Sequence, residues 1–177
     1  MTDQSKQARR QTVHRNPWFE VEHTEVGPQD WFEVTRADSA MVIAVTDDGS
    51  LVIVRGPRHT TGVGEFIELP SGGLEPSEKA EAAARRELLE ETGYSVGELK
   101  SLGWFFECPG ITASKCFVFA GPVTGWSTAT LEPAEHWTSG LASPDELHAA
   151  MASGAIRDGG TLAALGLFWN EAARRAE

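Results

Sequence analysis

The sequence predicts an α/β protein in which a mixed β-sheet lies between layers of helices, preceded by a short N-terminal antiparallel β-segment. The order of predicted elements supports this: strands, one helix, more strands, then two helices. Two near-continuous apolar segments, Met41 to Thr46 and Leu51 to Arg55, are typical of strands buried on both faces. Both observations favour a sheet that is covered by helices on its two sides.

Composition limits the classes of protein to consider. A chain of 177 residues, 41% hydrophobic and 23% charged, suits one soluble domain with a substantial core. No apolar segment approaches the length of a bilayer and no apolar signal core begins the chain, so we expect a cytoplasmic protein without a membrane partner. The formal net charge of −11 argues against a nucleic-acid partner. Cys108 and Cys116 imply no disulfide framework.

The N-terminal region divides into two parts before the main domain at 39–177. Residues 1–15 are polar, mildly basic and without periodicity, which predicts a disordered tail. Residues 16–38 hold two segments rich in β-formers, Trp18 to His23 and Trp31 to Arg36, separated by a Gly-Pro turn. We expect them to pair as strands, with their aromatic side chains serving a core or a dimer interface.

Strands and loops dominate the first half of the main domain. The two buried strands flank Asp47-Asp48-Gly49-Ser50, a hairpin signal. A glycine-rich loop over 56–64 then leads to a short strand from Phe66 to Leu69. Further strands are predicted at 98–102, 104–107, 116–120 and 137–141, with a long loop over 121–136 of the kind that often carries function.

Three helices are predicted. The first runs from Glu78 to Glu91, with Gly93 placed to end it. The second begins at the capping box Ser143-Pro144-Asp145-Glu146. The third covers Thr161 to Arg175, with an apolar stripe along one side.

The first helix ends in an acidic turn. Glu87, Glu90 and Glu91 are spaced i, i+3 and i+4, which places them on one face. Each like-charge pair costs about 0.2–0.5 kcal/mol, and the C-terminal end of the helix dipole disfavours anions further. Such a face is either solvated or neutralised by a hard cation, and oxygen-only carboxylate clusters suit Mg²⁺ or Mn²⁺.

The segment from Gly72 to Tyr94 resembles the Nudix box, G-x5-E-x7-REUxEExGU, at every fixed position. The resemblance implies a Nudix α/β/α sandwich with a mixed sheet and a pyrophosphohydrolase activity. It also implies that Glu87, Glu90, Glu91 and the backbone carbonyl of Ser71 bind Mg²⁺, with Mn²⁺ as a substitute. The competing interpretation is a surface helix with a solvated acidic patch.

Two other residues of the box have implied roles. Arg86 is expected to orient a box glutamate by an ion pair, although it is also placed as an ordinary i,i+4 partner of Glu90. Glu78 is expected to support the junction between loop and helix.

Residues outside the box resemble the ADP-ribose and nucleoside-diphosphate-sugar pyrophosphatases. The similarity lies in Arg55-x-x-Arg58, in Glu68-Leu69-Pro70-Ser71-Gly72-Gly73, and in Pro109-Gly110 fifteen residues past the box. It departs from that pattern at Ser71, where alanine is usual, and at Ser114, where glutamate is frequent. The substrate-binding residues implied are Arg55, Arg58, Glu68, Pro109, Gly110 and the stacking aromatic Trp18.

The general base of these pyrophosphatases is usually a glutamate in the loop before the last strand. Here that loop offers Glu132, Glu135 and His136, and we favour Glu135 as a catalytic residue. An ordinary solvated loop glutamate is the competing explanation.

The resemblance to these pyrophosphatases therefore implies a Mg²⁺-dependent hydrolase that splits ADP-ribose or a related nucleotide sugar into a nucleoside monophosphate and a sugar phosphate. It also implies a homodimer, in which the N-terminal strands at 16–38 cross to the partner and help to close its substrate site. The alternatives on the same fold are a nucleoside-triphosphate or RNA 5′-pyrophosphohydrolase and a non-catalytic nucleotide-sugar sensor.

Overall fold

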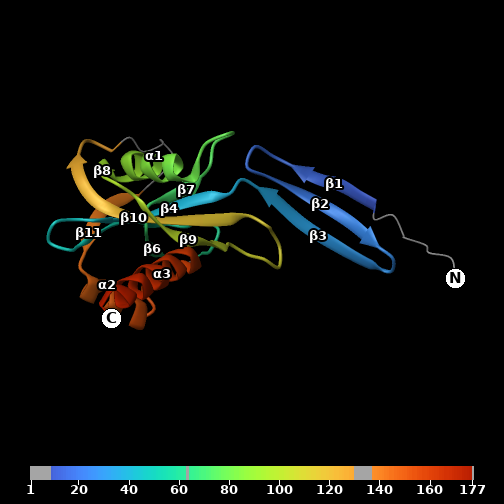
Figure 1. Cartoon of the computed structure of the whole chain (residues 1–177). Helices are drawn as coiled ribbons and strands as arrows, with labels where there is room; N and C mark the ends of the chain where they lie inside the picture. Colours follow the sequence, from blue (N-terminus) through green and yellow to red (C-terminus); the bar gives the residue numbers. More distant parts are fainter. Residues whose placement is uncertain (1–8, 63, 130–136, 177) are drawn as a thin grey trace.

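The computed structural model describes residues 9–62, 64–129 and 137–176, which form two sheets and three helices (Figure 1). The elements in chain order are β1 (Arg9–Arg15), β2 (Phe19–Val26), β3 (Gln29–Arg36), β4 (Ser39–Val45), β5 (Leu51–Pro57), β6 (Glu65–Glu68), β7 (Ser71–Gly73), α1 (Ala80–Thr92), β8 (Tyr94–Val96), β9 (Lys100–Phe106), β10 (Lys115–Trp126), β11 (Thr138–Ala142), α2 (Pro144–Ala152) and α3 (Gly159–Ala176).

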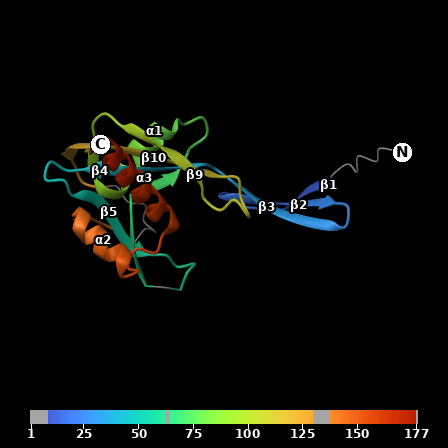
Figure 2. The ribbon, with the colours of Figure 1, turned by 60° about the horizontal axis from the view of Figure 1, so that its bottom comes forward.

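The larger sheet has eight strands and is mixed, as predicted. Its central path is β11-β5-β4-β10-β8, with β6 on β5, β7 on β4 and β9 on β10. β4 and β10 run parallel, and the other pairings are antiparallel. Helix α1 covers one face of this sheet, while α2 and α3 cover the other (Figures 1 and 2). This arrangement confirms the α/β/α sandwich.

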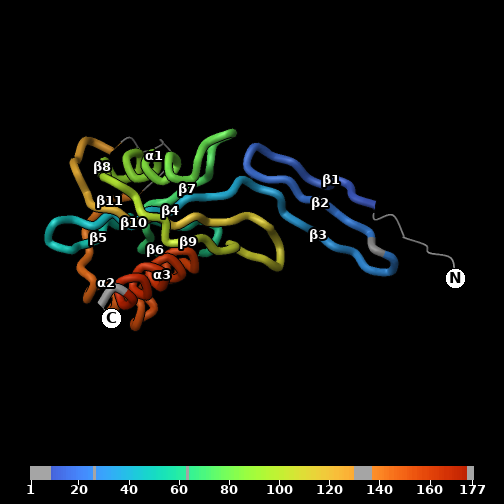
Figure 3. The backbone as a smooth tube through the Cα atoms, viewed as in Figure 1, coloured from blue at the N-terminus to red at the C-terminus, as the bar shows by residue number. Residues whose placement is uncertain are grey.

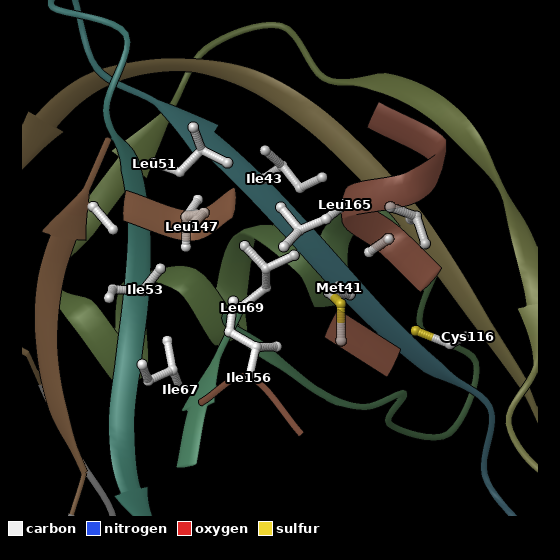
Figure 4. Packing of buried hydrophobic residues seen from close by; sticks show 13 residues of the cluster. Met41, Ile43, Leu51, Ile53, Ile67, Leu69, Cys116, Leu147, Ile156 and Leu165 are labelled. Carbon is white, nitrogen blue, oxygen red and sulfur yellow. The ribbon is translucent and has the colours of Figure 1, made fainter. Parts of the chain in front are cut away.

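Strand β4 contributes to a core on each side of the sheet, which explains its near-continuous apolar sequence. Met41 and Ile43 pack with Leu147 of α2 and Leu165 of α3 (Figure 4). The alternate residues face α1 and form the second core, which consists of Ala40, Val42, Ala44, Val52, Ala83, Ala84, Leu88, Val96 and Phe119. Burial of one large aliphatic side chain stabilises the fold by about 1.5–3 kcal/mol.

The three-stranded sheet β1-β2-β3 projects from the sandwich (Figures 1 and 3). The prediction of a disordered tail over 1–15 is wrong for residues 9–15, which form β1 and pair with β2. Cross-strand ion pairs hold β1 in place: Arg10 contacts Glu22 and Glu33, and Arg15 contacts Glu20. Because β1 is held by ion pairs between strands, its sequence lacks the apolar alternation that would predict a strand.

Short contacts connect this sheet to the sandwich. Val34 N–H donates to the Ile111 carbonyl at 2.8 Å, beyond the end of β9. The Asp38 carboxylate accepts a hydrogen bond from Lys115 N–H at 2.8 Å, and the Asp38 carbonyl accepts one from Leu74 N–H at 2.8 Å. The small sheet is therefore anchored to the β9–β10 turn and to the end of β7.

The strands after α1 differ from their predicted positions. The segment 98–107 holds one strand, β9, where two were expected, and β8 was not predicted. Residues 121–126 belong to β10 rather than to a loop, because they pair with β8 through a register shift between Val123 and Gly125. Their glycines and proline resemble loop signals, but the irregular pairing accommodates them.

Three helix boundaries coincide with capping interactions, whereas α1 begins at Ala80, two residues after the predicted Glu78, without a side-chain cap from Lys79. Gly93 ends α1 in the left-handed conformation, with φ 75°, and its N–H donates to the Leu89 carbonyl. The predicted capping box of Ser143 and Glu146 begins α2. Helix α3 starts earlier than predicted, where the Asp158 carboxylate accepts a hydrogen bond from Thr161 N–H at 2.6 Å. Within the described ranges, no helix has the length and apolarity to span a bilayer.

The two cysteines differ in accessibility, which predicts a difference in reactivity. Cys108 is exposed, whereas Cys116 is 3% exposed and burial raises the pKa of its thiol to about 11. We expect 5,5′-dithiobis(2-nitrobenzoate) to titrate one thiol rapidly in the native protein and the second only in denaturant. In Cys108→Ser the rapid phase should disappear; a persistent rapid phase would contradict the burial of Cys116.

Candidate active site

The turn that contains β7 brings backbone groups against the acidic end of α1. Ser71 N–H donates to a carboxylate oxygen of Glu91 at 3.0 Å. A Cβ atom placed on Gly72 would lie 2.1 Å from Oε1 of Glu87, so the carboxylate occupies the space that any larger residue would need. A larger residue at position 72 would therefore displace the Glu87 carboxylate from this position.

Arg86 connects the two ends of the helix. Its Nε and Nη2 donate to the Glu78 carboxylate at 3.0 and 2.9 Å, and its Nη1 donates to Glu87 at 2.7 Å and Glu90 at 3.1 Å. Nη2 also donates to the Gly73 carbonyl at 3.0 Å. These acceptors, Glu78 foremost, raise the pKa of the guanidinium. The partly buried cation offsets the repulsion among the box glutamates.

The donor atoms of the acidic turn are of the kind that a hard divalent cation prefers. Glu87, Glu90 and Glu91 offer only oxygen donors and line one pocket together with Ser71. Within the described part of the chain, no three acidic, histidine or cysteine side chains already converge at metal-ligand spacing. Instead, Glu87 and Glu90 contact Arg86, and Glu91 contacts the Ser71 amide. The metal-binding role of the glutamates stays a prediction.

Two pockets meet at the β7 turn. The carboxylate lobe, of about 960 Å³, is lined by Trp18, Arg58, Ser71, Gly72, Gly73, Glu75, Arg86, Glu87, Leu89, Glu90, Glu91 and Trp137. The aromatic lobe, of about 760 Å³, is lined by Arg36, Ser39, Met41, Arg58, Glu68, Ser71, Gly72, Gly73, Phe105, Phe106, Glu107, Cys108, Cys116, Asp158, Gly159, Gly160 and Ala163. Arg58 and the turn 71–73 form the wall that the lobes share. A separate pocket of about 780 Å³ between β9 and α3 contains none of the predicted site residues.

The guanidinium of Arg58 makes in-plane hydrogen bonds with one residue and packs its flat face on another. Its Nε and Nη2 donate to the two carboxylate oxygens of Glu68 at 2.8 and 2.5 Å. Glu68 itself is 3% exposed, so the pair neutralises a buried carboxylate. The guanidinium carbon lies 4.6 Å from the ring centroid of Trp137. The hydrogen bonds to Glu68 are the main cause of the raised pKa of Arg58.

The remaining predicted site residues fall into three groups. Trp18 lines the carboxylate lobe and is exposed. Arg55, Pro109 and Gly110 line neither lobe; the last two lie in the exposed turn after β9, next to Cys108, which does line the aromatic lobe. Glu135 lies outside the described residues, as do Glu132 and His136.

Comparison with known proteins decides the family. The NUDIX domain family model matches residues 35–164, which cover most of the chain. The protein belongs to the Nudix family. Within that family its sequence resembles an ADP-ribose pyrophosphatase.

Several relatives of this Nudix protein have named activities. It is 37% identical over 89 residues to an ADP-ribose pyrophosphatase of Bacillus subtilis (strain 168), covering 49% of this chain and 46% of that protein. It is 36% identical over 100 residues to a GDP-mannose pyrophosphatase of Klebsiella pneumoniae, covering 45% and 50%. The matched segments thus span half or less of these relatives. The crystal structure of an ADP compounds hydrolase superposes with a TM-score of 0.80 at 21% identity, covering 94% of this chain and 93% of that one, which shows the shared fold.

Several lining residues of the Nudix pocket were not predicted from the sequence. Trp137 was assigned only to a strand, and Arg36, Phe105, Phe106 and Asp158 were given no role. The departure at Ser114 is part of a buried network, since Ser114 Oγ donates to Glu107 at 2.6 Å and Ser39 Oγ donates to the other oxygen at 2.7 Å. The segment from Ile156 to Leu165 resembles the C-terminal helix entry of the ADP-ribose pyrophosphatases, and that resemblance was the sequence signal for the start of α3 beside the aromatic lobe.

The Glu78–Arg86 pair predicts a pH dependence of stability. Hydrogen bonds from Arg86 hold the pKa of Glu78 below its ordinary value of 4.5. Because the folded pKa is depressed, the pair contributes fully above pH 4.5 and its contribution is lost as pH falls through the folded pKa. We expect the melting temperature of Glu78→Gln to be lower than that of the wild type at pH 6. The difference between the two melting temperatures should narrow towards pH 3. A difference in melting temperature that stays constant would contradict this pairing. Glu81→Gln, in the first turn of α1, serves as the control.

Proposed function

We propose that this Nudix hydrolase cleaves the diphosphate of ADP-ribose or a related nucleotide sugar in a Mg²⁺-dependent reaction. The observation that carries the proposal is the two-lobed pocket, in which glutamates line one lobe and an arginine stands on the shared wall. A nucleoside diphosphate sugar has two bulky ends joined by a diphosphate. A substrate of that shape fits two lobes that meet at the guanidinium of Arg58.

Local charge supports a diphosphate at this position despite the net charge of −11. Arg86 and Arg58 line the carboxylate lobe, and Arg36 and Arg58 line the aromatic lobe. Arginine donors recognise phosphate oxygens well. The activities for which the two relatives are named, ADP-ribose pyrophosphatase and GDP-mannose pyrophosphatase, favour the same substrate class.

The reaction joins water to one phosphorus and breaks the bridging P–O bond, giving a nucleoside monophosphate and a sugar phosphate. Mg²⁺ bound to Glu87, Glu90 and Glu91 would neutralise the phosphates and lower the pKa of a bound water. Arg58 holds the diphosphate, and Arg86 keeps the glutamates on one side of the lobe. For Glu135 we propose the role of general base; its neighbour Trp137 lines the carboxylate lobe.

A substrate panel tests this function. Purified protein is incubated with Mg²⁺, Mn²⁺ or EDTA and with ADP-ribose, ADP-glucose, GDP-mannose, NADH, a nucleoside triphosphate or 5′-triphosphorylated RNA, and products are separated by chromatography. We expect AMP and ribose 5-phosphate from ADP-ribose, with none in EDTA. Preference for a triphosphate or for RNA would support the other Nudix activities instead. No turnover of any compound would support a nucleotide-sugar sensor.

We also propose that the protein is a homodimer joined through the N-terminal sheet. Registers place Phe19, Val21, His23, Phe32 and Val34 on one face, which also carries Glu25, Asp30 and Arg36 towards its ends. The Arg10–Glu22 and Arg15–Glu20 ion pairs lie on the other face. Phe32 is 60% exposed and stacks on His23 with ring centroids 4.7 Å apart. An isolated sheet of this size needs an apolar face covered for stability.

Light scattering after size exclusion is expected to give twice the chain mass of 19.1 kDa for the wild type and a smaller mass for Phe32→Asp. The control is Trp31→Asp, because Trp31 lies on the opposite face of the same strand and should leave the dimer intact. A wild-type monomer would contradict the proposal.

A further inference from the structure

Arg58 is more tightly constrained than a phosphate-binding arginine on a loop would ordinarily be. It follows β5 directly, and half of its side chain is exposed. Even so, Glu68 of β6 fixes the guanidinium within its own plane by two hydrogen bonds, and Trp137, just before β11, covers one of its faces. Two contacts of different kinds leave the group little rotational freedom.

The constraint leaves donors for a ligand. Nε and Nη2 serve the carboxylate of Glu68, whereas Nη1 makes no hydrogen bond to any residue within the described ranges. A guanidinium carries five N–H donors in a rigid fork, so at least the two on Nη1 remain. Because Arg58 lines both lobes, these donors stand where the lobes join.

The ring of Trp137 packs on the guanidinium of Arg58. This ring lines only the carboxylate lobe, on the same wall as the guanidinium. Cation–π contact with tryptophan favours one orientation of a guanidinium and strengthens as water is excluded. Trp137 thus completes a clamp whose other half is the buried carboxylate of Glu68.

We propose that Trp137 is a positioning residue, which together with Glu68 fixes Arg58 as a preoriented cation for the substrate diphosphate. The inference rests on the proposed function and extends it to a residue that touches the substrate only through Arg58. Preorganisation lowers the ordering cost of binding. The clamp therefore acts on affinity for the diphosphate rather than on the chemical step.

Steady-state kinetics with ADP-ribose and Mg²⁺ test the role. For Trp137→Leu we expect KM to rise about 3- to 30-fold, the range that corresponds to loss of a cation–π contact, with kcat changed less than about threefold. Trp137→Phe should recover part of the affinity, because it keeps a ring over Arg58. The matched control is Trp104→Leu, which removes a similar contact, Lys115 at 4.7 Å from the Trp104 ring, outside both lobes.

A double-mutant cycle separates positioning from direct contact or simple packing. In an Arg58→Gln background, Trp137→Leu should raise KM by less than about twofold further, because the residue through which it acts is gone. Full additivity, or an unchanged KM in the single variant, would overturn the role of Trp137. A wild-type protein that turns over no compound in the panel would remove the proposed function and this role with it. Melting curves of each variant exclude unfolding as the cause of a raised KM.

Discussion

Replacement of Glu91 by glutamine is expected to lower kcat/KM for the preferred substrate by at least about 100-fold. The carboxylate lies in the carboxylate lobe and contacts the Ser71 amide, where the resemblance to the Nudix box assigns a metal ligand. Loss of one anionic ligand weakens the charge stabilisation that a metal gives, which amounts to several kcal/mol, and each factor of ten corresponds to about 1.36 kcal/mol. The measurement is product release at varied Mg²⁺ concentration.

The matched control for this variant is Glu81→Gln. Glu81 lies on the same helix, is exposed and pairs with Arg85 at 2.9 Å, and it lines neither lobe. Its activity and Mg²⁺ dependence should equal those of the wild type. If Glu91→Gln retains wild-type activity and Mg²⁺ dependence, the acidic turn of α1 is not the catalytic metal site.

Replacement of Gly93 by alanine is expected to be the most damaging small change to stability. Gly93 adopts φ 75°, and a Cβ there would lie 2.0 Å from the Ser127 carbonyl oxygen and 3.0 Å from Ala129 N. The left-handed conformation costs an alanine about 1–2 kcal/mol, and the clash with backbone adds to it, for a total of about 3 kcal/mol or more. Thermal denaturation should show a fall in Tm of about 6–12 °C.

Gly154→Ala separates the two contributions. Gly154 has φ 71°, close to that of Gly93, but a Cβ there would meet nothing within 4 Å. Gly154→Ala should therefore lose only the conformational contribution to stability, and its Tm should stay at least about 2 °C above that of Gly93→Ala. Equal losses in the two variants would show that the contact between Gly93 and Ser127 does not constrain the fold.

Local sequence signals predicted the parts of the fold that depend on neighbours in the chain. The apolar segments around Ile43 and Ile53 predicted β4 and β5, and Gly93 predicted the end of α1. The failures have a common cause. Strand β1 depends on ion pairs with β2, and residues 121–126 depend on pairing with β8. Both therefore depend on contacts with other strands, which the local sequence does not predict.

The candidate site divides in the same way. The residues of the box are close in sequence, and the spacing of Glu87 and Glu91 placed them on one face without a structure. Phe105, Asp158 and Trp137 reach the pocket only because the sheet order brings β9, α3 and β11 around the β7 turn. The sequence predicted that Arg58 binds substrate. The contacts that fix its guanidinium, from Glu68 and Trp137, depend on the tertiary structure and could not be predicted from the sequence.

A crystal structure of the protein with Mg²⁺ and α,β-methylene ADP-ribose tests the central claim most directly, because that compound binds but is not cleaved. We predict metal ions on the carboxylates of Glu87, Glu90 and Glu91, and the diphosphate group against the guanidinium of Arg58 where the two lobes join. A diphosphate bound away from Arg58, or metal ions that contact none of these glutamates, would contradict the account.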